Sequence, residues 1–120
     1  MPLQREPKAA AGAAAETAAA RFLAGRGLSL VCANYRCRRG EIDLVLREGE
    51  TTVFVEVRLR THPGFGGAAE SIDARKRSRI IAAARHYLAG KPESPCRFDV
   101  VLLDRLDPPR IKWIRDAFSA

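Results

Sequence analysis

The alternation of apolar and polar positions is clearest in the middle of the chain, where two apolar runs flank a short polar segment. Residues 41–47 and 51–58 are rich in β-branched side chains, and the segment around Gly49 between them has the composition of a turn. Two such runs joined by a turn predict neighbouring antiparallel strands of a hairpin. Neither run alternates strictly, which predicts that both faces of this hairpin are covered.

Two further segments have the pattern of helices. Residues 8–26 are dominated by alanine and end in glycines at 25 and 27, which predicts a helix whose first residues are frayed. Residues 71–88 carry an apolar stripe at helical spacing and are followed by Gly90 and Pro92, which end the helix. Glycine and proline make residues 61–67 a loop.

The remaining apolar runs read as three more strands. They lie at residues 28–35, 97–103 and 111–114, and the last is expected at an edge of the sheet. The predicted order is therefore α-β-β-β-α-β-β, an α/β fold in which helices flank a central mixed sheet. We expect one domain over residues 1–120, with residues 1–9 frayed.

Length and composition narrow the classes of protein that fit. The 120 residues are 47% hydrophobic, enough for one domain with one core. No apolar run approaches the roughly 20 residues of a membrane span, and the N-terminal segment lacks a hydrophobic signal core. Three cysteines without CxxC spacing favour neither a disulfide framework nor a zinc site. The sequence thus predicts a protein of the reducing cytoplasm with no membrane partner.

The charge balance favours a polyanionic partner. The chain has 21 basic and 14 acidic residues, a net charge of +7, and a pI near 10.0. About half of the clustered basic residues fit a solvated surface, and the rest fit phosphate contacts. Aromatic residues are few, so double-stranded or branched DNA is favoured over stacked single strands. The candidate nucleic-acid contacts are Arg36, Arg38, Arg39, Arg60, Arg75, Lys76 and Arg79.

The candidate chemistry rests on two carboxylates inside the apolar runs. Asp43 and Glu56 lie in the two strands of the predicted hairpin, where a buried charge is costly unless it is paired or binds a metal. In a simple register the two side chains converge, and paired carboxylates beside a cation suit Mg²⁺ or Mn²⁺ at a phosphodiester. The alternative is a buried ion pair of Glu56 with Arg58 or Arg60.

The same residues carry a resemblance to a known family. The runs Gly40–Val45 and Val53–Arg60 resemble the YraN-like family of restriction-endonuclease-fold proteins, a bacterial branch of the PD-(D/E)xK nuclease superfamily similar in fold to Holliday-junction resolvases. The resemblance covers roughly residues 10–118. Further similar positions are Glu16, Ala19, Phe22-Leu23, Asn34-Tyr35-Arg36, Phe65-Gly66, Lys76, Arg97–Val100 and Trp113–Phe118.

The resemblance implies a fold, a site and an activity. The fold would be a restriction-endonuclease-like core, of the kind found in tRNA endonucleases and resolvases. Asp43 and Glu56 match the acidic metal ligands, the Val57 carbonyl a backbone ligand, and Glu16 an acidic residue of the first helix that faces the site. The implied cofactor is Mg²⁺ or Mn²⁺ and the implied reaction is hydrolysis of DNA. Related resolvases act as dimers, which makes a homodimer one option for this chain.

Arg58 departs from the pattern of the family. It stands where the motif usually has lysine, and an arginine stays protonated and cannot act as a base. One interpretation is that Arg58 clamps a phosphate and the site still cleaves; the other is that the site binds nucleic acid with little or no cleavage. Lys76, from the second helix, is a further hypothesis for the missing ammonium.

Other features of the sequence weigh less. His62 is expected in a solvated loop, and His86 is expected to be structural. The pattern lacks a phosphate-binding glycine loop or a nucleophile elbow, which disfavours nucleotide hydrolysis and acyl transfer. A third hypothesis is an interaction protein whose acidic pair is purely structural; it predicts neither metal binding nor salt-dependent DNA affinity.

Overall fold

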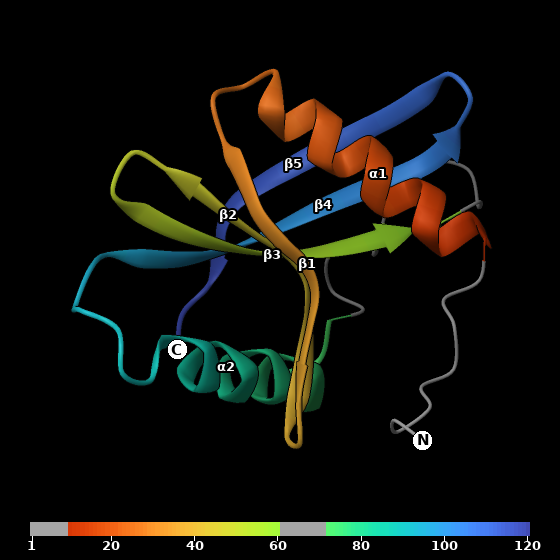
Figure 1. Ribbon diagram of the computed structural model, residues 1–120. Coiled ribbons are helices and arrows are strands. Elements are labelled where there is room, and N and C mark those ends of the chain that lie inside the picture. The colour runs from red at the N-terminus through yellow and green to blue at the C-terminus, as the bar shows by residue number, and fades with distance from the viewer. Residues whose placement is uncertain (1–9, 61–71) are drawn as a thin grey trace, which may run out of the picture.

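Residues 10–60 and 72–120 are described by the computed structural model of this chain. Within these ranges a five-stranded sheet lies between two helices, one on each face (Figure 1). The predicted order of elements and the mixed α/β architecture are confirmed. The elements are α1 (Ala10–Ala24), β1 (Ser29–Cys37), β2 (Gly40–Glu48), β3 (Thr51–Leu59), α2 (Ala74–Leu88), β4 (Cys96–Leu106) and β5 (Pro109–Phe118).

The strands follow one another across the sheet in the order β1-β2-β3-β4-β5. The first three form an antiparallel meander, and β5 is antiparallel to β4. β3 and β4 are parallel and therefore need a crossover connection, which contains α2. β5 lies at an edge as predicted, although it is longer than the expected residues 111–114.

The two helices explain why the central strands lack strict alternation. The buried apolar residues of α1 recur every four positions, at Ala15, Ala19 and Leu23, and cover one face of β2, β3 and β4. Ile80, Ala83 and Ala84 of α2 cover the other face. Because both faces are buried, apolar residues occupy successive positions of β2 and β3, as the sequence predicted.

The element boundaries differ slightly from the predictions. α2 begins at Ala74 instead of residue 71, because Asp73 caps it by accepting a 2.9 Å hydrogen bond from the Lys76 N–H. The predicted loop at residues 61–67, with His62 and Phe65, lies outside the described residues. Neither helix in the described part of the chain is long and apolar enough to span a membrane.

Candidate functional site

Pairing between β2 and β3 stops one residue pair before the two predicted carboxylates. Leu44 pairs with Val55, and continued pairing would set Asp43 opposite Glu56. Instead, Asp43 Oδ2 accepts a 2.8 Å hydrogen bond from the Val57 N–H. A side-chain carboxylate thus takes the place of a backbone acceptor at this level of the sheet.

The neighbouring strand is irregular at the same level. Asn34 lies between two paired residues of β1 and has a φ of 56°, a left-handed conformation that asparagine tolerates better than most residues. On β2, Ile42 and Val45 pack toward α2 while Leu44 packs toward α1, so the alternation of faces breaks at Asp43. Two adjacent strands therefore depart from regular geometry around Asp43.

Glu56 lies at the centre of a small cluster of charges. The Glu56 residue is 5% exposed and Asp43 is 6% exposed. Lys76 Nζ lies 3.3 Å from Glu56 Oε2, and an Arg58 guanidinium nitrogen lies 3.5 Å from the same oxygen. Burial and the adjacent Asp43 carboxylate raise the pKa of Glu56 to about 7, although Lys76 opposes this shift.

The structure thus brings four of the predicted site residues together. Asp43 and Glu56 come from neighbouring strands and interact directly, and Lys76 comes from a separate helix. The ion pair of Glu56 with Arg58, which the sequence offered as a structural alternative, is also present. The ion pair of Glu56 does not explain why a second carboxylate lies beside the first, since this repulsion is unfavourable unless a proton or a cation is held between them.

Asp99 shows what a structural buried carboxylate looks like in this fold. It lies on β4 and is 0% exposed. Its oxygens accept hydrogen bonds from Arg97 Nε at 3.0 Å, Trp113 Nε1 at 2.9 Å and the Asp116 N–H at 2.8 Å. Arg97 also donates to Glu48, which ties β2, β4 and β5 together. This network was not predicted from the sequence, although Asp99 carries the same signal as Glu56, a carboxylate within an apolar strand.

Glu16 is buried on α1, at 7% exposure, and this burial excludes the solvated helix charge that was one interpretation. Its role toward the site stays a prediction. Within the described residues, no three His, Cys, Asp or Glu side chains form a cluster suited to a metal ion, so Glu16 does not complete such a set with Asp43 and Glu56.

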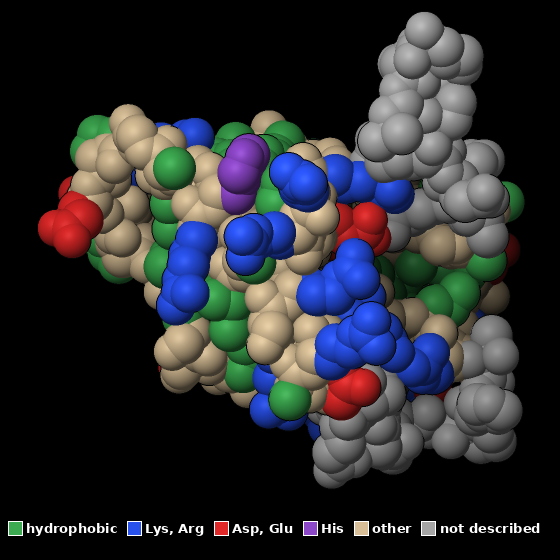
Figure 2. All heavy atoms as spheres, turned by 90° about the horizontal axis from the view of Figure 1, so that it is seen from below, with side chains coloured by type: hydrophobic (Ala, Val, Ile, Leu, Met, Phe, Trp, Pro, Cys, Tyr) green, Lys and Arg blue, Asp and Glu red, His purple; other side chains and the backbone are tan. Residues whose placement is uncertain are grey.

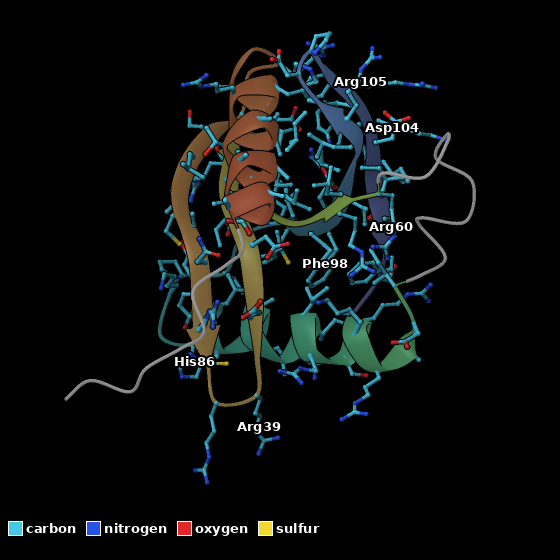
Figure 3. All side chains as sticks on the ribbon, turned by 90° about the vertical axis from the view of Figure 1, so that its right-hand side faces the viewer. Arg39, Arg60, His86, Phe98, Asp104 and Arg105 are labelled. Carbon is cyan, nitrogen blue, oxygen red and sulfur yellow. The ribbon has the colours of Figure 1, made fainter. Side chains whose placement is uncertain are left out.

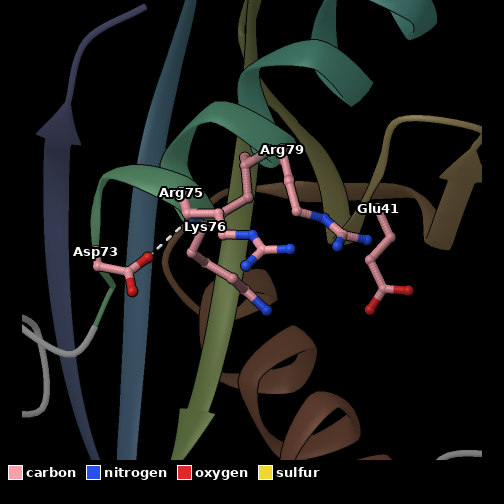
Figure 4. Close-up of a pocket in the computed structure, with 6 residues that line it drawn as sticks. Glu41, Asp73, Arg75, Lys76 and Arg79 are labelled. Carbon is pink, nitrogen blue, oxygen red and sulfur yellow. Dashed lines mark hydrogen bonds between the residues drawn. The ribbon is translucent and has the colours of Figure 1, made fainter.

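An open pocket of about 420 Å³ lies beside the charge cluster (Figure 4). Figure 4 shows Arg75 and Lys76 extending from the first turn of α2, and Arg79 pointing toward Glu41. Glu41 itself pairs with Arg36 at 3.0 Å. Lys76 belongs to both features, because it lines the pocket and contacts Glu56.

The basic residues of the β1–β2 turn lie next to those of α2. The hairpin tip, residues Arg36–Gly40, reaches past α2, and Figure 3 shows Arg39 projecting from it. Gly40 packs so closely against α2 that an added Cβ would lie 2.1 Å from the Arg79 carbonyl oxygen. The view of this face shows many Lys and Arg side chains gathered on it (Figure 2). Arg38, Arg39, Arg75 and Arg79 are exposed.

Arg60 and His86 lie outside the hairpin tip. Arg60 follows β3, its N–H bonds the Leu103 carbonyl at 2.7 Å, and it lies apart from Arg39 in Figure 3. It therefore lies away from the hairpin tip, and its role as a nucleic-acid contact stays a prediction. His86 hydrogen-bonds through Nδ1 to the Tyr35 hydroxyl, joining α2 to β1, which supports the structural role that the sequence predicted.

The donor set suits a hard divalent cation. Mg²⁺ prefers oxygen ligands and often takes one or two carboxylates while it keeps several waters. Asp43 and Glu56 supply two adjacent carboxylates. Burial and then the Asp43 charge raise the pKa of Glu56, and a bound cation would favour the charged form of both groups. These residues, with the Val57 carbonyl as a backbone candidate, therefore fit the metal that the sequence predicts.

Comparison with known proteins decides the family. The model of the uncharacterised protein family UPF0102 matches residues 15–103, which span both carboxylates and Lys76. The chain belongs to this family. Membership in UPF0102, the YraN family, confirms the resemblance noted in the sequence.

Relatives within UPF0102 are similar over nearly their whole length. A UPF0102 protein of Nitrosomonas europaea is 56% identical over 109 residues, which cover 90% of this chain and 92% of the relative. A UPF0102 protein of Methylobacillus flagellatus is 55% identical over 106 residues, covering 88% and 94%. One from Pseudomonas aeruginosa is 50% identical over 122 residues, covering 97% and 98%. These names state a family without an activity.

Proposed function

We propose that this protein has a restriction-endonuclease-like fold, binds DNA, including branched DNA, and hydrolyses phosphodiester bonds with Mg²⁺ or Mn²⁺. The observation that carries the proposal is the meeting of two buried carboxylates beside Lys76 and Arg58 where β2–β3 pairing stops. A cluster of this composition suits a metal ion next to a phosphate group.

Residues of β2 and β3 would bind the metal ion at this site. Asp43, Glu56 and the Val57 carbonyl would hold the cation, and its chemistry is to polarise the phosphate and lower the pKa of bound water. Asp43 is itself held by the Val57 N–H, which fixes its carboxylate against β3. Burial of both carboxylates excludes bulk water and strengthens their interaction with positive charge.

The DNA would lie along the hairpin tip and the exposed face of α2. Arg38, Arg39, Arg75 and Arg79 are exposed there, and the net charge of +7 favours association with a polyanion. Such phosphate contacts position a duplex without reading its sequence. Two copies of the chain would match the two-fold symmetry of a four-way junction. The three free cysteines suit a protein that acts on DNA in a reducing cytoplasm.

A second candidate is a nucleic-acid-binding module that does not cleave. The observation in its favour is Arg58, which stands on β3 beside Glu56 and cannot exchange protons near neutral pH. This candidate keeps the basic surface and the metal site and lacks efficient hydrolysis.

Cleavage assays separate the two candidates. Labelled four-way junction, flap and plasmid DNA are incubated with the wild type in Mn²⁺ or Mg²⁺, beside Asp43→Ala and Glu56→Ala. Metal-dependent cleavage that both variants lose would support the nuclease. DNA binding without cleavage by the wild type would support the binding module. Absence of both metal and salt-dependent DNA binding would contradict both candidates and leave a structural role for the acidic pair.

A further inference from the structure

Two cations contact the same oxygen of Glu56, and their surroundings differ. Arg58 comes from β3, its side chain is 19% exposed, and it is not among the described residues that line the adjoining pocket. Lys76 comes from α2, its side chain is 37% exposed, and it lines that pocket. A substrate that enters the pocket can therefore reach Lys76 while Arg58 remains against Glu56.

We propose that Lys76 is the cation that contacts the reacting phosphate group, and that Arg58 is a positioning residue that holds Glu56. The inference rests on the proposed function and assigns its cation to α2, whose residues line the pocket, and not to β3. Arg75 and Arg79, which line the same pocket, would contact the phosphates that flank the reacting one.

The chemistry of the two side chains agrees with this division. An ammonium has three donors, so Lys76 can keep its contact with Glu56 and still donate to a phosphate oxygen. Hydrolysis forms a P–O bond from water and breaks the bond to a sugar oxygen, while negative charge grows on the phosphate oxygens. One proton of the water ends on the leaving oxygen, and the other is released when the new phosphomonoester ionises. Lys76 stabilises that charge by donating a hydrogen bond from its ammonium group.

The start of α2 holds Lys76 in place. Its N–H donates to the Asp73 cap at 2.9 Å, and Ile72 and Ile80 are buried on either side along the chain. The backbone at Lys76 is therefore fixed, while its partly exposed side chain can adjust to a substrate. Figure 4 shows the Lys76 side chain leaving the first turn of α2 in the direction of β3.

The test compares four variants of the full chain. Lys76→Met removes the ammonium and keeps an apolar stem, and Lys76→Met combined with Arg58→Lys returns an ammonium to β3. Arg58→Lys alone is the matched single variant. Arg105→Met, an exposed position near the β4–β5 turn and far from α2 in Figure 3, is the control. Each is measured for single-turnover cleavage in Mn²⁺, DNA affinity in Ca²⁺, and Mn²⁺ binding by calorimetry at pH 8.5.

The proposal expects a specific pattern. Lys76→Met should cleave at least about 100-fold more slowly, with DNA affinity within about five-fold and Mn²⁺ affinity equal or higher, because a competing charge is gone. The double variant should recover at least about ten-fold of the lost rate, since the ammonium again lies beside Glu56. Arg105→Met should cleave like the wild type.

Other results would overturn the inference in distinguishable ways. Cleavage by Lys76→Met within about three-fold of the wild type would remove Lys76 from the reaction and leave the nuclease function standing. A loss of Mn²⁺ binding in parallel with cleavage, or no recovery in the double variant, would make Lys76 a residue that merely keeps the carboxylates ordered. A wild type that binds DNA without cleaving it would overturn the nuclease function and this role together.

Discussion

Glu56 and Asp99 are carboxylates of neighbouring strands, and the fold buries both of them almost completely. Asp99 receives hydrogen bonds from Arg97, Trp113 and a backbone N–H, so its charge is compensated within the fold. Glu56 faces another carboxylate as well as two cations. The first arrangement stabilises the fold, whereas the second holds a repulsion that only an added cation or a proton removes.

The pH dependence of stability should report the burial of the Glu56 charge together with this repulsion. The pKa of Glu56 rises from 4.5 to about 7 on folding, so the folded chain binds more protons than the unfolded chain between these values. The wild type should therefore lose stability as pH rises from 4.5 to 7, by about 3 kcal/mol in total. Glu56→Gln should escape this loss, so its advantage in free energy of unfolding grows over that interval and stays constant at higher pH.

Urea denaturation at pH 5 and pH 8 measures that difference. Glu93→Gln, at an exposed glutamate, is the matched control and should follow the wild type at both pH values. At pH 8, saturating Mn²⁺ should stabilise the wild type and leave Glu56→Gln unchanged, because the ligand binds the folded state of the wild type alone. Equal pH profiles of Glu56→Gln and the wild type would mean that the Glu56 charge is not destabilising.

At the scale of elements, the site depends on how the first turn of α2 is fixed. Asp73 caps this helix and lies three residues before Lys76. Its side chain accepts a hydrogen bond from the Lys76 N–H. The cap therefore sets both the stability of the helix and the position of the ammonium that reaches Glu56.

Removal of the cap should loosen the site. Asp73→Ala should lower the free energy of unfolding by about 1 kcal/mol and speed hydrogen exchange of the Lys76 N–H. Asp73→Asn, which retains a side-chain acceptor, should be close to the wild type in both measurements. Similar exchange rates in the alanine variant and the wild type would show that the turn is ordered without its cap.

The hairpin tip depends on a close approach to the same helix. Gly40 lies so near the Arg79 backbone that a methyl group cannot fit without movement of the hairpin. Gly40→Ala should destabilise the fold by about 1–3 kcal/mol or more and weaken DNA binding as the tip moves away from α2. Gly25→Ala is the control, because its Cβ would meet the Phe22 carbonyl at an ordinary 3.4 Å. Thermal unfolding and DNA titration of both variants measure these effects, and a Gly40→Ala variant as stable as the wild type would contradict the tight contact.

At the scale of the whole molecule, many basic side chains gather on the face that carries α2 (Figure 2). Arg39 on the hairpin tip and Arg105 near the β4–β5 turn lie at opposite ends of the molecule in Figure 3. Both side chains are exposed, so the same substitution at each changes the net charge equally and differs only in its position on the surface.

Reversal of one charge at each end should have unequal effects. Arg39→Glu should weaken binding of a DNA duplex and reduce the slope of log affinity against log salt by about 1. Arg105→Glu makes the same change in net charge and should alter the slope much less. Fluorescence anisotropy from low to physiological salt measures both slopes. Equal losses in the two variants would indicate that net charge, and not a defined surface, governs binding.

The sequence by itself determined the elements and their order along the chain. Glycine, proline and apolar spacing placed both helices and all the strands within a few residues, because these signals are local. Unbroken apolar runs also predicted strands covered on both faces. The cap at Asp73 and the length of β5 escaped prediction, since they depend on contacts at the ends of elements.

The candidate site could also be predicted from the sequence only in part. A carboxylate inside an apolar strand is visible in sequence, and this signal found Asp43 and Glu56; it applied equally to Asp99 and could not tell the three apart. Only the tertiary structure showed that Asp99 is satisfied by hydrogen bonds, that Asp43 and Glu56 face each other, and that Lys76 reaches them from α2. The sequence shows which residues carry charge. Whether a buried charge meets a hydrogen-bond donor, an opposite charge or a like charge depends on segments far apart in the chain, which only folding brings together.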